Sequence, residues 1–87
     1  MSRILIIDPS DNVAVALEPA EKGNTLVLPD GREITALDAI PFAHKTAIVP
    51  LAEQAPVVKY GEVIGLTTRA INVGEHVHIH NMRSQQS

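Results

Sequence analysis

Three histidines, His76, His78 and His80, alternate with Val77 and Ile79 near the end of the sequence. Alternate side chains of a strand point to the same face, so this spacing predicts a strand over 76–80 with one imidazole face and one apolar face. Residues two apart lie about 7 Å from each other, so neighbouring histidines can share one metal ion. All three together span about 13 Å and converge only where the strand bends.

Such an imidazole face has several uses. Zinc, iron and manganese accept imidazole ligands, and a carboxylate such as Glu75 or Asp8 would complete a ligand set. The face is equally compatible with a solvated or interface surface whose apolar side packs inward, or with contact to a substrate or a partner. The short H-x-H spacing alone does not separate these three interpretations.

Two polar pairs offer further binding groups. Asp11 and Asn12 precede an apolar run, where they would bind a hydroxylated acid or a metal, or serve only as favoured turn residues. His44 and Lys45 would supply a base and a cation for a carboxylate. They are equally compatible with a plain loop pair in which the aliphatic part of Lys45 lies along a sheet.

Composition limits the class of protein. Eighty-seven residues correspond to one domain, 1–87, and the absence of cysteine excludes a disulfide framework, a thiolate zinc site and a cysteine nucleophile. A net charge of −3, without a basic cluster or an aromatic pair, argues against nucleic-acid binding. The apolar runs are far shorter than the roughly 20 residues of a membrane span, and no signal peptide is recognisable. We therefore expect a soluble cytoplasmic protein.

The elements that must position these residues are short strands. Apolar, β-branched runs recur at about ten-residue spacing between Pro-, Gly-, Asn- and Asp-rich turns, with no convincing amphipathic helix and no apparent internal repeat. This pattern predicts a compact all-β barrel or sandwich, ordered over about 3–82, with a polar tail at 83–87. The expected strands cover 3–7, 13–17, 25–28, 33–37, 46–51, 57–60, 63–68 and 76–80.

Four segments in order, 11–17, 44–48, 59–65 and 71–81, resemble the small domain of the altronate and galactarate dehydratase family, a SAF-type domain with a β-clip fold. The resemblance extends over about residues 3–83. The chain departs from the family pattern at two places. At the first place, Asp8-Pro9-Ser10 stands where the family commonly has a histidine, so that Asp8 would replace an imidazole ligand. At the second place, Ala43 stands before His44 where the family commonly has glycine.

In that family the domain is either the N-terminal part of a long dehydratase or a separate small subunit. For this chain the resemblance implies a small subunit that is not active alone and acts beside a large catalytic subunit. In that family, water is removed from a hydroxylated sugar acid to give a 2-keto-3-deoxy acid, assisted by a divalent metal (Fe²⁺, Mn²⁺ or Mg²⁺) that would be shared with the large subunit. The implied site comprises catalytic His44, Lys45 and His78, substrate-binding Asp11, Asn12 and Lys45, and metal-binding His76, His78 and His80.

Two alternatives to the dehydratase stay open. The first is the small subunit of a sulfolactate sulfo-lyase, a relative with the same two-part organisation in which sulfite leaves instead of water. The second is a stand-alone module that binds a small molecule or a protein. Assembly into a homo-oligomer is compatible with all of these functions.

Overall fold

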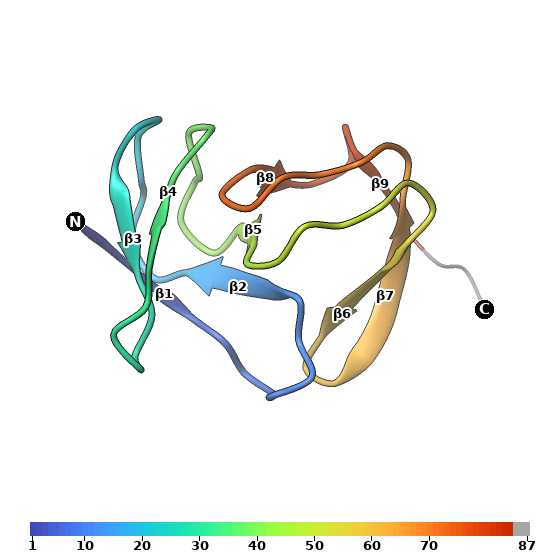
Figure 1. Cartoon of the computed structure of the whole chain (residues 1–87), viewed down its shortest axis with the longest axis horizontal. Coiled ribbons are helices and arrows are strands. Elements are labelled where there is room, and N and C mark those ends of the chain that lie inside the picture. Colours follow the sequence, from blue (N-terminus) through green and yellow to red (C-terminus); the bar gives the residue numbers. More distant parts are fainter. Residues whose placement is uncertain (85–87) are drawn as a thin grey trace.

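The computed structural model describes residues 1–84 and consists of short β-strands joined by turns, with no helix in that range (Figure 1). The predicted all-β class is confirmed. In chain order the strands are β1 (Ser2–Leu5), β2 (Val13–Ala16), β3 (Thr25–Val27), β4 (Glu33–Thr35), β5 (Lys45–Ala47), β6 (Pro56–Lys59), β7 (Glu62–Thr67), β8 (His76–Val77) and β9 (Met82–Ser84). Residues 1–84 therefore contain no helix that could cross a membrane. The cytoplasmic location stays a prediction.

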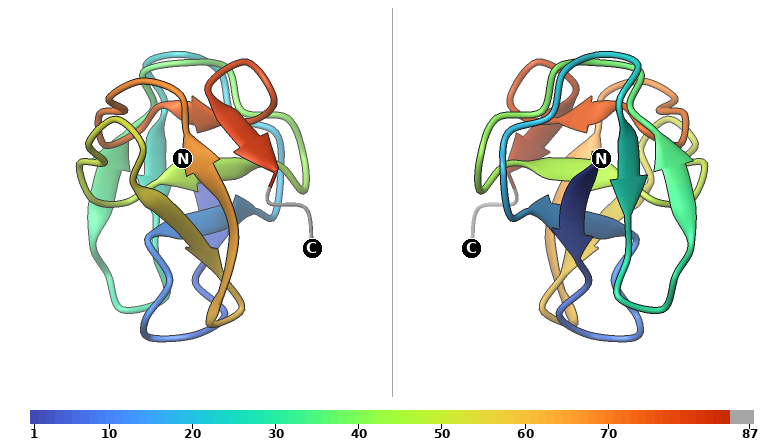
Figure 2. Two further views of the ribbon diagram at one scale, coloured as in Figure 1. Left: turned by 90° about the vertical axis from the view of Figure 1, so that its right-hand side faces the viewer. Right: turned by 90° about the vertical axis from the view of Figure 1, so that its left-hand side faces the viewer.

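The strands form two sheets. The larger has the order β4-β3-β1-β2-β5-β8, and the smaller has the order β6-β7-β9. The β3–β4 and β6–β7 hairpins lie at opposite ends of the molecule (Figure 2). In β2, Ala14 and Ala16 enter one hydrophobic core while Val13 enters the other, because successive side chains point to opposite faces. One strand thus connects both cores.

One turn geometry recurs along residues 1–84. Ala20 forms an isolated β-bridge with Ile40, and Leu51 forms one with Ile71, so the partners of each pair are 20 residues apart. Three residues after each bridge residue the backbone has positive φ, as in a type II turn. These positions are Gly23 (φ 93°), Ala43 (φ 69°), Gln54 (φ 62°) and Gly74 (φ 93°).

Hydrogen bonds repeat with the turn. The next residue donates its N–H to the carbonyl three positions back, at 3.0 Å for Asn24, 3.1 Å for His44, 3.3 Å for Ala55 and 3.1 Å for Glu75. We name these the first turn (21–24), second turn (41–44), third turn (52–55) and fourth turn (72–75). The recurrence lies in backbone conformation, whereas the sequence shows no internal repeat.

Two predicted elements near the end of the chain are wrong. The expected strand over 76–80 ends at Val77, because residues 78–81 form a turn in which Met82 N–H donates to the His78 carbonyl at 2.9 Å. Arg83 and Ser84, predicted to belong to a polar tail, pair with β7 as part of β9. The rest of the predicted tail, 85–87, lies outside the described residues.

Candidate functional site

Antiparallel pairing of β5 with β8 brings His44 to the histidines of the last segment. The register pairs Lys45 with Val77 and Thr46 with His76. One step further along the same register places His44 opposite His78, and their rings stack with centroids 4.6 Å apart. The contact thus depends on strand pairing between distant parts of the chain, and not on local spacing.

His44, His76 and His78 form what we call the histidine cluster. The Nδ1 atom of His44 lies 2.9 Å from the Nε2 atom of His76, a hydrogen bond between the two rings. One ring nitrogen from each of the three residues lies within 4.8 Å of the others, and all three side chains are half-buried. His80 is exposed, with its ring centroid 5.3 Å from that of His76, and stands at the rim of the cluster.

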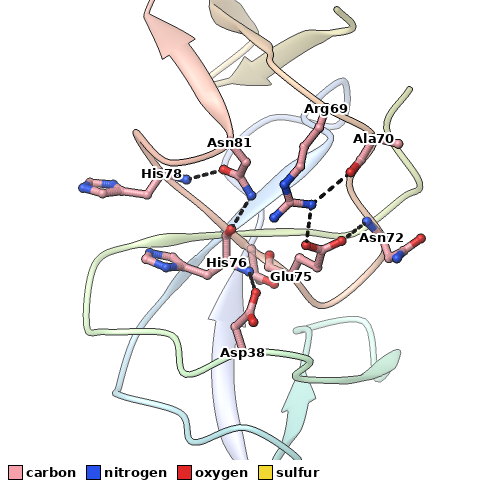
Figure 3. A network of polar contacts seen from close by, with 9 residues as sticks. Asp38, Arg69, Ala70, Asn72, Glu75, His76, His78 and Asn81 are labelled. Carbon is pink, nitrogen blue, oxygen red and sulfur yellow. Dashed lines mark hydrogen bonds and ion pairs between the residues drawn. The ribbon is translucent and has the colours of Figure 1, made fainter. Parts of the chain in front are cut away.

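Asn81 fixes the backbone on which two of these histidines stand (Figure 3). It is fully buried, donates from Nδ2 to the His76 carbonyl at 2.8 Å and accepts from the His78 N–H at 2.9 Å. The His76 and His78 rings project to the same side of this segment in Figure 3. The turn therefore brings the two imidazoles closer together than the predicted straight strand would have done.

Two carboxylates support the segment from the side opposite the rings (Figure 3). Asp38 accepts the His76 N–H at 3.0 Å, and Glu75 accepts from Asn72 N–H at 2.6 Å and from Arg69 at 3.1 Å. Because these oxygens are engaged with backbone and arginine groups, they act as supports for the fourth turn. Neither Glu75 nor Asp8, each predicted as a possible metal ligand, joins the metal-capable group within residues 1–84.

Burial and repulsion from neighbouring residues disfavour the charged forms of His76 and His78. Burial, followed by the neighbouring His44, His80 and His78, lowers the pKa of His76 to about 4. Burial also lowers the pKa of His78, with added repulsion from His44, Lys45 and His80. At neutral pH these rings are therefore neutral, the state in which imidazole acts as a base or as a metal ligand.

Lys45 lies next to the cluster at the start of β5. Its side chain is half-buried, and burial, followed by the positive charge of Lys59, lowers the pKa of its ammonium group. Of the three residues predicted to be catalytic, the structure brings His44 and His78 together. The pairing of Lys45 with Val77 places the Lys45 side chain on the opposite sheet face from these two rings. The chemical roles of all three residues stay predictions.

Asp11 and Asn12, predicted to bind substrate, lie apart from the cluster and hold the 8–12 turn against β6 and the following turn. Asp11 is buried and accepts N–H groups of Gly61 (2.8 Å) and Asp8 (3.0 Å). Burial alone would raise its pKa, but these backbone donors outweigh that effect and lower it. Asn12 bonds the Pro56 carbonyl and the Val58 N–H at 2.9 and 2.8 Å. These contacts give both residues a structural role, and the substrate-binding role stays a prediction.

Comparison with known proteins assigns the family. Residues 2–85 match the model of the altronate/galactarate dehydratase SAF domain. The chain belongs to this family. Its SAF domain is 37% identical over 87 residues to "Altronate dehydratase" of Bacillus subtilis (strain 168), covering 100% of the chain and 17% of that protein. It is 42% identical over 77 residues to "Altronate dehydratase" of Escherichia coli (strain K12), covering 88% of the chain and 15% of that protein.

A third relative is close to the SAF domain in length as well as in sequence. The "(2R)-sulfolactate sulfo-lyase subunit alpha" of Chromohalobacter salexigens is 39% identical over 88 residues, which cover 94% of each chain. The SAF domain thus spans less than a fifth of the altronate dehydratases and nearly all of the sulfo-lyase subunit alpha.

The donor set of the SAF domain fits a first-row divalent metal. Three half-buried imidazoles with nitrogens within 4.8 Å of one another suit iron and accept manganese, whereas magnesium prefers oxygen ligands. A metal held through both nitrogens of the His44–His76 pair would replace their 2.9 Å hydrogen bond, because coordination requires the lone pairs. Without a metal, the same bond fixes the relative orientation of the two rings.

Sequence reasoning missed the residues that support the cluster. Asn81 falls within a segment that resembles the family, but nothing in its neighbours indicates that its side chain would be fully buried. Asp38 lies 38 residues from the His76 N–H that it accepts. The first role depends on a local turn and the second on a contact across 38 residues, and the sequence pattern indicates neither.

Proposed function

We propose that this chain is the small subunit of an altronate-type dehydratase, which removes water from a hydroxylated sugar acid together with a large catalytic subunit. The histidine cluster carries this proposal. It supplies three imidazoles, of which His76 and His78 have lowered pKa values, and the half-buried Lys45 follows His44 in the chain, on a domain of the dehydratase family.

The elimination requires a base and an anion-binding group. A base removes the proton α to the carboxylate, hydroxide leaves the neighbouring carbon with a proton, and the resulting enol becomes the 2-keto-3-deoxy acid. We assign proton transfer to His44 or His78 and carboxylate binding to Lys45. A divalent metal held by His44, His76 and His78, with the large subunit completing its coordination, would polarise the departing hydroxyl.

The sulfo-lyase subunit is a second candidate, favoured by length. The sulfo-lyase subunit alpha of C. salexigens matches over 94% of its own length, whereas the altronate dehydratases continue far beyond the matched region. Its chemistry would need the same α-proton abstraction, with sulfite leaving the neighbouring carbon in place of hydroxide. The same residues would then serve either leaving group.

Co-purification of the tagged chain from its source, followed by mass spectrometry, tests the subunit assignment. We expect a large dehydratase-like chain to be recovered. The reconstituted pair would then be assayed on altronate, galactarate and sulfolactate, with sulfite release separating the two candidates. A folded chain that co-purifies with nothing would contradict the proposal.

Substitution tests the role of the cluster in the reconstituted pair. We expect His44→Ala and His78→Ala each to lower kcat/KM by about 10²-fold or more, the range for a lost acid–base group. Asn24→Ala is a matched control, because Asn24 occupies in the first turn the place that His44 occupies in the second. Unchanged turnover in both histidine variants would remove the cluster from the mechanism.

A further inference from the structure

Gly74 is the point at which the fourth turn meets the segment 35–38, which begins at the end of β4. An added Cβ at Gly74 would clash with the Thr35 carbonyl oxygen. The Gly74 N–H donates to the Ala47 carbonyl at 2.9 Å, and the Gly74 carbonyl accepts the Leu37 N–H at 2.9 Å. The fourth turn is thus held by backbone contacts on two sides, and only a residue without a side chain fits at this position.

The first turn shows that this exclusion does not come from the turn geometry. Gly23 has the same φ of 93°, but an added Cβ there would have no atom within 4 Å. Ala43 and Gln54 occupy the equivalent positions of the second and third turns, so the turn itself accepts a side chain. The exclusion of a side chain at Gly74 is therefore due to its close approach to Thr35.

The segment that packs against Gly74 also holds the backbone of His76. Asp38, the last residue of that segment, accepts the His76 N–H at 3.0 Å (Figure 3). Leu37, the residue before it, donates to the Gly74 carbonyl. A shift of the fourth turn away from this segment would therefore lengthen both hydrogen bonds. It would also move the His76 ring relative to His44, whose Nδ1 atom lies 2.9 Å from His76 Nε2.

The segment 35–38 is itself anchored in the part of the molecule that carries β3 and β4. Ala36 is buried in the same core as Leu26 of β3. Its N–H donates to the Asn24 carbonyl at 2.8 Å, and its carbonyl accepts the Gly23 N–H at 2.8 Å. The segment is thus a fixed surface, against which the fourth turn and the residues after it are placed.

We propose that Gly74 is a positioning residue of the histidine cluster, because the absence of a side chain lets the segment 35–38 hold His76 against His44. Asp38 acts through the same contact. The importance of this positioning for catalysis rests on the proposed function, whereas the geometry concerns this chain alone. Catalytic and ligating groups act within about 0.5 Å of their productive positions, so a displaced fourth turn would impair the cluster without removing any of its side chains.

Gly74→Ala and Gly23→Ala form a matched pair that tests the role of Gly74. Both place a Cβ on a backbone with φ 93°, and only Gly74→Ala creates a clash. NMR of the ¹⁵N- and ¹³C-labelled chain at pH 8, with a chelator present, measures the result. We expect nuclear Overhauser contacts between the His44 and His76 ring protons to be retained in Gly23→Ala and lost in Gly74→Ala.

Amide exchange in the same samples separates a local displacement from a general loss of stability. We expect the His76 amide of Gly74→Ala to exchange about tenfold faster relative to the Leu28 amide, which is the effect of one lost hydrogen bond. The Leu28 N–H donates to the Arg32 carbonyl within the β3–β4 hairpin, so it reports on the remote part of the fold. Gly23→Ala should leave this ratio unchanged.

Asp38→Ala keeps the proposal testable if Gly74→Ala does not fold. It removes the acceptor of the His76 N–H without adding a clash, and we expect the same loss of ring contacts. Retained ring contacts in a folded Gly74→Ala chain, or in Asp38→Ala if the former is unfolded, would overturn the positioning role. Equal loss in Gly23→Ala would overturn it as well, because strain at positive φ would then be the cause.

Turnover of the reconstituted pair separates the positioning role from the proposed function. We expect Gly74→Ala to lower kcat by about tenfold or more and Gly23→Ala to leave it unchanged. Lost ring contacts with unchanged turnover would support the positioning role and would remove the cluster from the mechanism. Retained ring contacts would refute the positioning role and leave the proposed function intact.

Discussion

Asn81 is the residue on which the geometry of the histidine cluster most depends. Asn81→Ala would leave the His76 carbonyl and the His78 N–H without their buried partner and would open a small cavity. We expect a loss of about 2–3 kcal/mol in the free energy of unfolding, measured by urea denaturation. Asn24→Ala, at a half-exposed position, should change it by no more than about 0.5 kcal/mol. Equal effects of the two substitutions would contradict the supporting role of Asn81.

His76 gives the metal-free chain a pH-dependent stability. Its pKa is about 4 in the folded chain and 6.5 when unperturbed, so between these values the unfolded chain binds a proton that the folded chain does not. Stability therefore falls as the pH is lowered from about 6.5 toward 4. Because the ring is only partly buried, we expect a loss of about 1–2 kcal/mol after solvent screening.

Urea denaturation at pH 7 and pH 4.5, in the presence of a chelator, measures this difference. The His76→Gln variant should lose a large part of the pH dependence because it removes the titrating ring, and His78, whose pKa is also lowered, supplies a remainder of the same sign. Asp11 and Glu18, whose carboxyl pKa values are lowered, affect stability mainly below the interval between the two measured pH values. Their contribution is lost only as the pH falls toward their own pKa values. An unchanged pH dependence in the variant would refute the assignment to His76.

At the scale of elements, the second turn contains a local strain. Ala43 adopts φ 69°, a conformation that costs a residue with a Cβ about 1–2 kcal/mol relative to glycine. Glycine also loses about 0.5–1 kcal/mol more backbone entropy on folding. We expect Ala43→Gly to raise the free energy of unfolding by about 0.5–1 kcal/mol.

A matched control lies in the third turn. Ala52 is exposed and is not among the residues with positive φ, so Ala52→Gly brings the entropic loss without relief of strain. We expect that variant to be destabilised by about 0.5–1 kcal/mol in the same urea measurement. Destabilisation by Ala43→Gly of the same size would show that the second turn carries no strain.

A comparison of the expected strands with the observed ones shows how much of the fold the sequence predicts. Strands were predictable because β-branched runs alternate with Pro, Gly and Asn turns, and all eight expected segments overlap an observed strand. The eighth, 76–80, is cut short at Val77 because the Asn81 side chain bonds the backbone that a longer strand would have used. The alternation of His, Val and Ile over 76–80 does not indicate that the Asn81 side chain competes with strand pairing for these backbone groups.

The histidine cluster and the recurring turn could not be predicted from the sequence for a different reason. His44 reaches His76 across 32 residues through the pairing of β5 with β8, which no local pattern specifies. The turn repeats by backbone conformation and not by residue type, since Gly, Ala and Gln all occupy the positive-φ position. The sequence thus indicated which residues carry chemistry but not which of them meet.

At the scale of the whole molecule, a small chain is held together by a shared strand. Because β2 supplies side chains to both cores, the half that carries β3 and β4 cannot move independently of the half that carries the β6–β7 hairpin. The histidine cluster sits where β5 pairs with β8 at the edge of the larger sheet, and β5 pairs on its other side with the shared strand β2. The cluster is therefore one strand away from the strand that both cores share, although it is itself only half-buried.

The recurring turn contains one position whose backbone conformation is fixed and a following position with an ordinary backbone conformation. The backbone at Gly23, Ala43, Gln54 and Gly74 dictates a conformation, while the residue that follows each one faces no such demand. Those following residues are Asn24, His44, Ala55 and Glu75, which differ completely in chemistry. The domain thus offers equivalent sites on one scaffold, so mutation can exchange reactive groups among them without redesign of the backbone.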